Sequence, residues 1–188
     1  MVKKSFLFLI LLSVFSCGKS LSLEEKQEFT KKGKEITQDS FKELSGKLMD
    51  QMSIGGPAQA IPFCNIQAIP ITNQLSEKYN VLIKRTSDKI RNLTNHPTKR
   101  EIEIISTYKN LLKKGKLLTS IVELDSDGLK HYYAPIVINS TCLVCHGKKG
   151  EQLTVKTDSI INSFYPNDNA IGYHEGDVRG IWSITFNN

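Results

Sequence analysis

Two cysteines and a histidine stand together in the segment STCLVCHG, which covers residues 140–147. Cys142 and Cys145 are separated by two residues, and His146 follows the second cysteine directly. Three chemistries use this kind of spacing: a redox disulfide, a metal-binding knuckle, and the covalent attachment of haem. Each makes a different demand on the rest of the chain, so the surrounding sequence has to decide between them.

The flanking sequence argues against a redox disulfide and against a zinc site. A thioredoxin-type pair belongs to a βαβ unit, whereas here a hairpin pattern precedes the motif and no long helix follows Gly147. A structural zinc site needs four ligands, so Cys64 would have to join the two cysteines and the histidine of the motif in a Cys3His set. Two of those ligands would be adjacent in sequence, and no second knuckle occurs. Zinc binding therefore stays an alternative only.

Covalent haem attachment accounts for every residue of the motif. Each thiol would add to one vinyl group of the porphyrin, and the histidine after the second cysteine would lie under the iron. We therefore predict haem c as the cofactor, attached through Cys142 and Cys145, with His146 as an axial iron ligand. Gly147 leaves the backbone room beside the ring. Attachment of this kind implies the cytochrome c maturation machinery as a partner.

The first residues predict that the chain is exported. Two lysines precede an apolar run over residues 5–15, which is shorter than the roughly 20 residues that span a bilayer. We interpret residues 1–16 as a signal peptide and residues 17–22 as a tether lipidated at Cys17, because the sequence before this cysteine resembles a bacterial lipobox. The alternative is an ordinary cleaved signal. Either interpretation predicts the periplasmic side, where covalent cysteine chemistry persists, and the lipid would add a membrane anchor.

Composition and charge exclude some classes of function. The 188 residues include 25 lysines and arginines against 19 acidic residues, a formal charge of +6. Loss of Lys3 and Lys4 with the signal peptide would lower this charge to +4. The basic residues are spread out and not interleaved with aromatic ones, so no nucleic-acid partner is expected. We also find no catalytic triad, carboxylate pair or phosphate loop, and expect no enzyme.

The elements that must position the motif are helices first and strands afterwards. Apolar spacing predicts a helix from Leu23 to about Met52, and Gly55-Gly56-Pro57 ends it, with the proline suited to begin the next helix. Further helices are expected over residues 63–80, interrupted near Pro70, and over 98–116 and 158–164. Strands are expected over 117–124, 130–138 and 180–186, the first two joined by a turn at 125–128. This order predicts one α+β domain over residues 23–188, with N-terminal helices and a small antiparallel sheet.

Short blocks of residues spread along the chain form a second pattern. In chain order they are Gly55-Gly56-Pro57, Cys64-Asn65, Arg85-Thr86-Ser87, Arg91-Asn92, Asn95-His96-Pro97 with Glu101, Tyr132-Tyr133 with Pro135-Ile136, the motif with Gly147, Tyr165-Pro166, and the run from Gly172 to Gly180. Together these blocks resemble the PAS-like c-type haem proteins with a histidine and a cysteine as axial ligands, which are exported or sensor-attached bacterial domains. The resemblance covers about residues 30–186 and implies a PAS-like α+β fold.

The resemblance implies a role for the cysteine that the motif leaves over. Cys64 would be the second axial ligand of the iron, opposite His146. From the residues alone, a small buried hydrophobe would be the expected state of such a cysteine. Pro62, two residues earlier, departs from the family pattern. It removes a backbone donor and can kink the helix that presents the thiol.

Further side chains are candidates for the haem pocket. Arg85 and Arg91 match haem propionates, because a guanidinium pairs with a carboxylate in bidentate fashion; solvation or loop pinning is the alternative. Tyr133 would line the haem from its strand. Asp177 and Arg179 are interpreted as residues that tie the last loop rather than as chemical groups.

An iron with both axial positions filled has no open site for oxygen or peroxide. This favours a low-potential redox or electron-transfer module over catalysis. The alternative of a different class is a redox or gas sensor, in which Cys64 is lost on reduction or displaced by a small gas ligand. Either role needs a redox or signalling partner that the sequence does not identify. A Cys3His zinc-binding structural protein is the third hypothesis.

Overall fold

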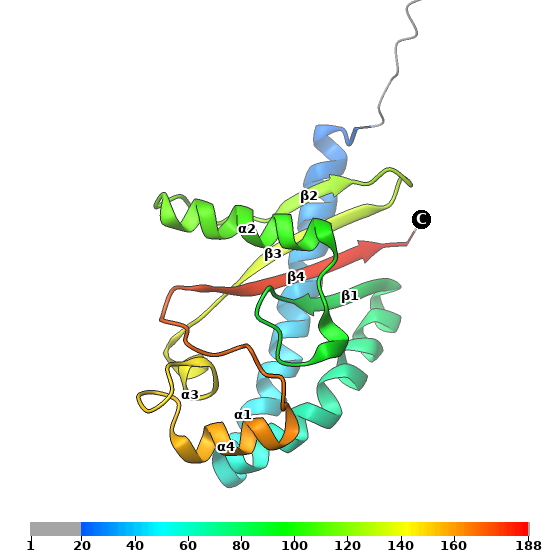
Figure 1. Cartoon of the computed structure of the whole chain (residues 1–188). Helices are drawn as coiled ribbons and strands as arrows, with labels where there is room; N and C mark the ends of the chain where they lie inside the picture. Colours follow the sequence, from blue (N-terminus) through cyan, green and yellow to red (C-terminus); the bar gives the residue numbers. More distant parts are fainter. Residues whose placement is uncertain (1–19, 188) are drawn as a thin grey trace, which may run out of the picture.

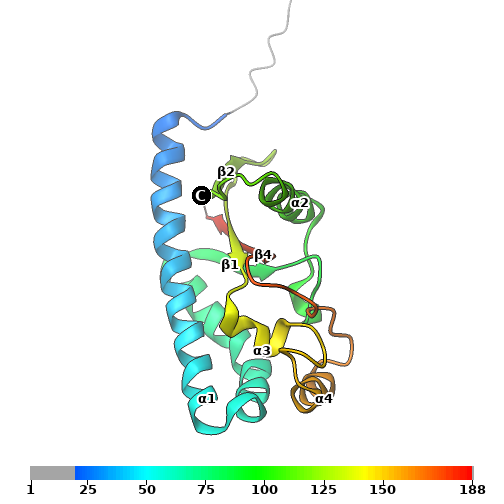
Figure 2. The ribbon, with the colours of Figure 1, turned by 90° about the vertical axis from the view of Figure 1, so that its left-hand side faces the viewer.

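Two helical arms joined at a glycine pair form the first part of the computed structural model, which describes residues 20–187. Helix α1 spans Leu23–Tyr79, but Gly55 (φ −154°, ψ 22°) and Gly56 (φ 60°, ψ −153°) leave the helical conformation. The chain turns back on itself there, so that the two arms form a hairpin (Figure 2). Gly56 occupies a region of backbone conformation that only glycine adopts readily. The predicted end of the first helix at the glycine pair is confirmed.

The first arm begins in a capping box. The Ser22 hydroxyl accepts the backbone N–H of Glu25, and the Glu25 carboxylate accepts the backbone N–H of Ser22. Leu21 is buried beside this cap. The last residues of the predicted tether over 17–22 therefore pack as the start of the helix. The signal peptide over residues 1–16 and the lipidation at Cys17 lie outside the described residues.

The second arm is longer than predicted. It begins directly at Pro57, and its backbone stays helical through Pro62 and Pro70. The interruption expected near Pro70 is therefore wrong. Both Pro70 and Ile66, whose carbonyl loses its donor, are exposed, so water can satisfy that carbonyl. The helix that carries Cys64 is thus continuous on both sides of the thiol.

One antiparallel sheet of four strands packs on α1, in the order β1-β4-β3-β2. Its strands are β1 (Val81–Thr86), β2 (Ile121–Leu124), β3 (Lys130–Val137) and β4 (Val178–Phe186). The predicted hairpin of β2 and β3 is confirmed, with the Asp125 carboxylate accepting amides of the turn. Strand β1 was not predicted, and β2 starts at Ile121 instead of residue 117. The expected α+β architecture with a small antiparallel sheet is confirmed.

Helices cover both faces of this sheet. The first arm of α1 packs on one face through a cluster that includes Ile36, Ile83, Trp182 and Ile184. The approach is close at Gly33, where a Cβ atom would overlap the ring of Tyr132. Helix α2 (Lys99–Lys113) covers the other face through Ile104, Ile105 and Tyr108 (Figure 1). None of the helices in the described part of the chain is long and apolar enough to cross a membrane.

A third apolar cluster lies below the sheet and holds the motif segment. There α4 (Val155–Phe164) packs on the second arm of α1 through Ile61, Leu153 and Ile161, with Cys145 against the cluster. The motif itself forms a short 3₁₀ turn, Ser140–Cys142, and one helical turn, α3 (Leu143–His146). Figure 2 shows α3 between α1 and α4. Strand β3 and this cluster therefore fix the place of the motif.

Candidate functional site

The motif is shaped locally by one capping side chain and one glycine. The Asn139 side chain accepts the backbone N–H of Cys142 at 3.1 Å and also its thiol at 3.1 Å. At the other end, a Cβ on Gly147 would lie 2.6 Å from the Leu143 carbonyl oxygen and 2.9 Å from Cβ of Gln152. Only glycine fits where the chain leaves the turn. Cys142 and Cys145 are free thiols here, one helical turn apart.

His146 is held in one tautomer by a backbone carbonyl. Its Nδ1 lies 2.6 Å from the carbonyl oxygen of Ala170, which has no proton to give, so Nδ1 carries the proton and donates it. Burial lowers the pKa of His146 well below its ordinary value, and the positive charges of Arg91 and Arg179 add to this. The ring is therefore neutral, and Nε2 keeps a free lone pair. This is the state in which a histidine binds a metal.

Cys64 is brought to the motif by the second arm of α1. Burial raises the pKa of the Cys64 thiol, and the charges of Arg85 and Arg91 partly oppose this. Burial likewise raises the pKa of Cys145, and the charge of a Cys64 thiolate would raise it further. The two thiols therefore lie close enough to act on each other electrostatically, although they are 81 residues apart in sequence.

Arg91 is committed to holding the loops around the motif. Its Nη2 donates to the Cys145 carbonyl at 2.6 Å, to Oδ2 of Asp168 at 2.9 Å and to the Ala170 carbonyl at 3.3 Å. The ion pair is buried, with side chains 14% and 2% exposed. Its Nε is buried without a hydrogen-bond partner in the described structure. These contacts correspond to the loop-pinning alternative for Arg91.

Two other arginines of the site have no carboxylate to neutralise them. Arg85 on β1 lies over the Trp182 ring at 5.7 Å, and Arg179 on β4 lies over the Tyr173 ring at 5.4 Å. Burial lowers the pKa of both guanidinium groups. Among residues 20–187, no carboxylate lies within ion-pair distance of either side chain. The site therefore carries an excess of partly buried positive charge, which is suited to an anionic ligand.

Arg179 was assigned only a loop-tying role from the sequence. It does donate from Nη1 to the Lys89 carbonyl at 3.0 Å, so that part of the interpretation agrees with the structure. What the sequence reasoning missed is that its charge also acts on His146. The available signal was an arginine within the otherwise buried run VRGIWSITF of β4.

Tyr133 does not lie with the thiols. It packs under α2 with Ile104 and Val178, and its carbonyl accepts the Tyr108 hydroxyl at 3.0 Å. Two other tyrosines take its place beside the motif. The Tyr173 ring meets His146 edge-on at 6.3 Å, and the charge of a Cys64 thiolate raises the pKa of Tyr165, which burial raises most. Both belong to blocks that the sequence resemblance singled out.

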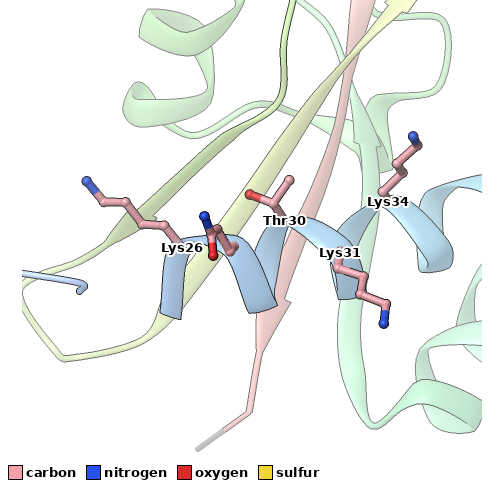
Figure 3. Close-up of a pocket in the computed structure, with 5 residues that line it drawn as sticks. Lys26, Thr30, Lys31 and Lys34 are labelled. Atoms are coloured by element: carbon pink, nitrogen blue, oxygen red, sulfur yellow. The ribbon is translucent and has the colours of Figure 1, made fainter. Parts of the chain in front are cut away.

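The thiols and histidine do not form a closed metal cage. In the part of the chain that the structure describes, no three or more His, Cys, Asp or Glu side chains converge as ligands of a metal ion. The Cys3His set of the zinc alternative is therefore not assembled. A surface hollow lies elsewhere, along the first turns of α1 at Lys26, Thr30 and Lys34 (Figure 3). It contains none of the site residues.

Together, the fold and the site define a class: α+β domains that hold a CxxCH turn between a helical hairpin and a small antiparallel sheet. The chain belongs to the Tll0287-like family, whose model matches residues 20–187. Among solved structures, it is similar to the crystal structure of the cyanobacterial heme-protein Tll0287, with a TM-score of 0.59 and 21% sequence identity. The alignment covers 88% of this chain and 96% of the other, and at this identity the likeness shows a shared fold. No curated protein matches the chain.

Proposed function

We propose that the protein binds haem c, with Cys142 and Cys145 as the attachment sites, and acts as a redox or electron-transfer module. The observation that carries the proposal is the state of His146. Its Nδ1–H is used by the Ala170 carbonyl, which leaves Nε2 free as an iron ligand beside two free thiols. The description of the solved relative as a heme-protein supports the same cofactor.

The positive charges of the site, like its thiols, fit a haem. A haem carries two propionate carboxylates, and Arg85 and Arg179 are two partly buried arginines without an ion-pair partner among residues 20–187. We therefore assign the propionates to Arg85 and Arg179. Arg91 is less suited to this task because Asp168 already neutralises it.

When bound, haem supplies a one-electron ferric/ferrous couple. The chain itself orients His146 through Ala170 and presents Cys64 from the second arm of α1. Burial raises the pKa of Cys64, so its thiolate needs positive charge nearby; Arg85 contributes most, and Arg91, although paired with Asp168, contributes less. We propose Cys64 as the second axial ligand. With both positions filled, binding of oxygen or peroxide is disfavoured.

The cellular setting is part of the proposal. Covalent haem attachment through a CxxCH motif takes place outside the cytoplasm, which agrees with a signal peptide at residues 1–16 and lipidation at Cys17. The protein would then be anchored on the periplasmic side of a membrane, after passing through the cytochrome c maturation machinery. Its redox or signalling partner would be reached from there.

The test is a pyridine haemochrome assay on denatured full-length protein, produced in a host that matures c-type cytochromes. We expect covalent haem in the wild type and none in the double variant Cys142→Ser/Cys145→Ser. Cys64→Ala is the matched single-thiol variant: it should keep the covalent haem and change the ferric spectrum. Absence of covalent haem from the wild type would refute the proposal. An unchanged ferric spectrum in Cys64→Ala would show that Cys64 is not an iron ligand.

A sensor function is the second candidate, and one observation favours it. Cys64 lies on the second arm of α1, whereas the attachment thiols lie in the 3₁₀ turn and in α3, after β3. Loss of Cys64 from the iron would therefore not release the haem. If reduced protein binds carbon monoxide and loses its thiolate spectrum, sensing is supported; unchanged coordination through the redox cycle supports electron transfer.

A further inference from the structure

A buried ion pair stands behind the carbonyl that receives the His146 proton. Both carboxylate oxygens of Asp168 are used: Oδ2 accepts from Arg91 at 2.9 Å, and Oδ1 accepts the backbone N–H of Ala170 at 2.8 Å. The Asp168 side chain is only 2% exposed. Asp168 therefore fixes the residue whose carbonyl receives Nδ1–H of His146.

The same arginine also holds the motif side of this contact. Arg91 donates at 2.6 Å to the carbonyl of Cys145, the residue directly before His146. Arg91 thus holds the residue before His146, and it holds the acceptor Ala170 both directly, by donating to its carbonyl at 3.3 Å, and through Asp168. Two more contacts secure the acceptor loop: the Ile90 carbonyl accepts the Asn169 N–H at 3.0 Å, and Lys89 Nζ donates to the Ile171 carbonyl at 2.7 Å.

This arrangement uses more buried charge than pinning a loop requires. A loop can be fastened by a backbone hydrogen bond alone, as the bond from the Asn169 N–H to the Ile90 carbonyl does. Burying an ion pair carries a desolvation penalty, which good geometry and full hydrogen bonding must offset. Both Asp168 oxygens are satisfied: Oδ1 by the backbone N–H of Ala170, the residue whose carbonyl receives the His146 proton, and Oδ2 by Arg91, whose Nη2 donates to that same carbonyl at 3.3 Å.

We propose that the Arg91–Asp168 ion pair is a positioning pair that sets the hydrogen bond from His146 Nδ1–H to the Ala170 carbonyl, and through it the redox potential of the haem iron that Nε2 would bind. The part that concerns potential rests on the proposed haem function. A stronger hydrogen bond from Nδ1–H makes the imidazole a stronger electron donor and favours the ferric state. Weakening the pair should therefore raise the potential.

Two substitutions of Asp168 separate the effect of the carboxylate's position from the effect of its charge. Asp168→Glu keeps the negative charge but moves the carboxylate by one methylene, whereas Asp168→Asn removes the charge. Asp158→Asn is the control, because Asp158 on α4 forms a partly exposed ion pair with Lys149 of the preceding loop and its loss removes the same charge. Partners of metal-bound histidines typically change affinity about tenfold or more when altered. A tenfold change in ferric over ferrous preference is about 59 mV for a one-electron couple.

We expect redox titration of the haem-loaded full chain to show an upward shift of that order in both Asp168 variants and little change in Asp158→Asn. A shift in Asp168→Asn with none in Asp168→Glu would overturn the proposal in favour of a plain charge effect. Equal potentials in all four proteins would overturn it as well.

A second measurement, of proton exchange at His146, needs no haem. Its wild-type result alone can overturn the proposal, so it still applies if an Asp168 variant fails to fold. In the full chain produced without haem attachment, the Nδ1–H of His146 should be a slowly exchanging NMR signal, identified by its absence in His146→Gln. Exchange should be at least about tenfold faster in a folded Asp168→Glu protein. A wild-type proton that exchanges like that of a free imidazole would overturn the proposal. If the haemochrome assay fails but this proton is protected, only the haem function fails.

Discussion

The turn between the two arms of α1 makes a quantitative prediction about stability. Gly56 has φ 60° and ψ −153°, a conformation that a residue with a Cβ adopts only under strain of about 1–3 kcal/mol. A Cβ at Gly56 would meet no atom within 4 Å, so the cost of Gly56→Ala is conformational and not steric. For a domain of this size we expect a loss of about 2–4 °C in Tm per kcal/mol.

Gly46 is the matched control for this prediction. It lies in the first arm of the same helix, and a Cβ there also meets nothing within 4 Å. Because its backbone is helical, Gly46→Ala should stabilise the protein by about 0.5–1 kcal/mol. Urea unfolding followed by circular dichroism at 222 nm measures both changes. If the two variants shift the free energy of unfolding in the same direction, the assignment of the hairpin to backbone strain at Gly56 is refuted.

Three further predictions concern the site and the sheet. Gly147→Ala should reduce covalent haem loading in the haemochrome assay, because the new methyl collides with the α3 carbonyl behind it. Arg85→Met and Arg179→Met should each weaken haem retention in a Cys142→Ser/Cys145→Ser background, whereas exposed Arg100→Met should not. Burial would raise the pKa of Glu101, but hydrogen bonds from Lys84 and Thr98 lower it overall. Glu101→Gln should therefore destabilise the protein at pH 7. That difference should shrink as the pH falls from 4.5, the ordinary pKa of a glutamate, through the lower pKa that Glu101 has in the folded protein.

Local signals explain which elements could be predicted. The helical stripe over residues 98–116, the turn at residues 125–128 and the glycine pair at 55–56 act through neighbours in sequence, and each is found where expected. Strand β1 has the apolar run Val-Leu-Ile but only one residue between it and α1. This segment forms a strand because it pairs with β4, which lies far along the chain. No local sequence pattern encodes that pairing.

The same division holds for the site. Residue type and spacing alone marked Cys142, Cys145 and His146, because adjacent chain positions determine how two thiols and an imidazole are presented. The partners of those groups come from distant parts of the chain: Ala170 for His146, and the hairpin arm that carries Cys64. Only the tertiary structure places them together.

The arginines show the physical reason most clearly. Arg85, Arg91 and Arg179 are equivalent in sequence, since each is a long cation that can bind a carboxylate. Arg91 forms an ion pair with Asp168, while Arg85 on β1 and Arg179 on β4 are partly buried without such a partner. The sequence by itself determined which chemistry is available to the site. Tertiary packing decided which charges remain unpaired, because pairing depends on distances between elements that the chain brings together only on folding.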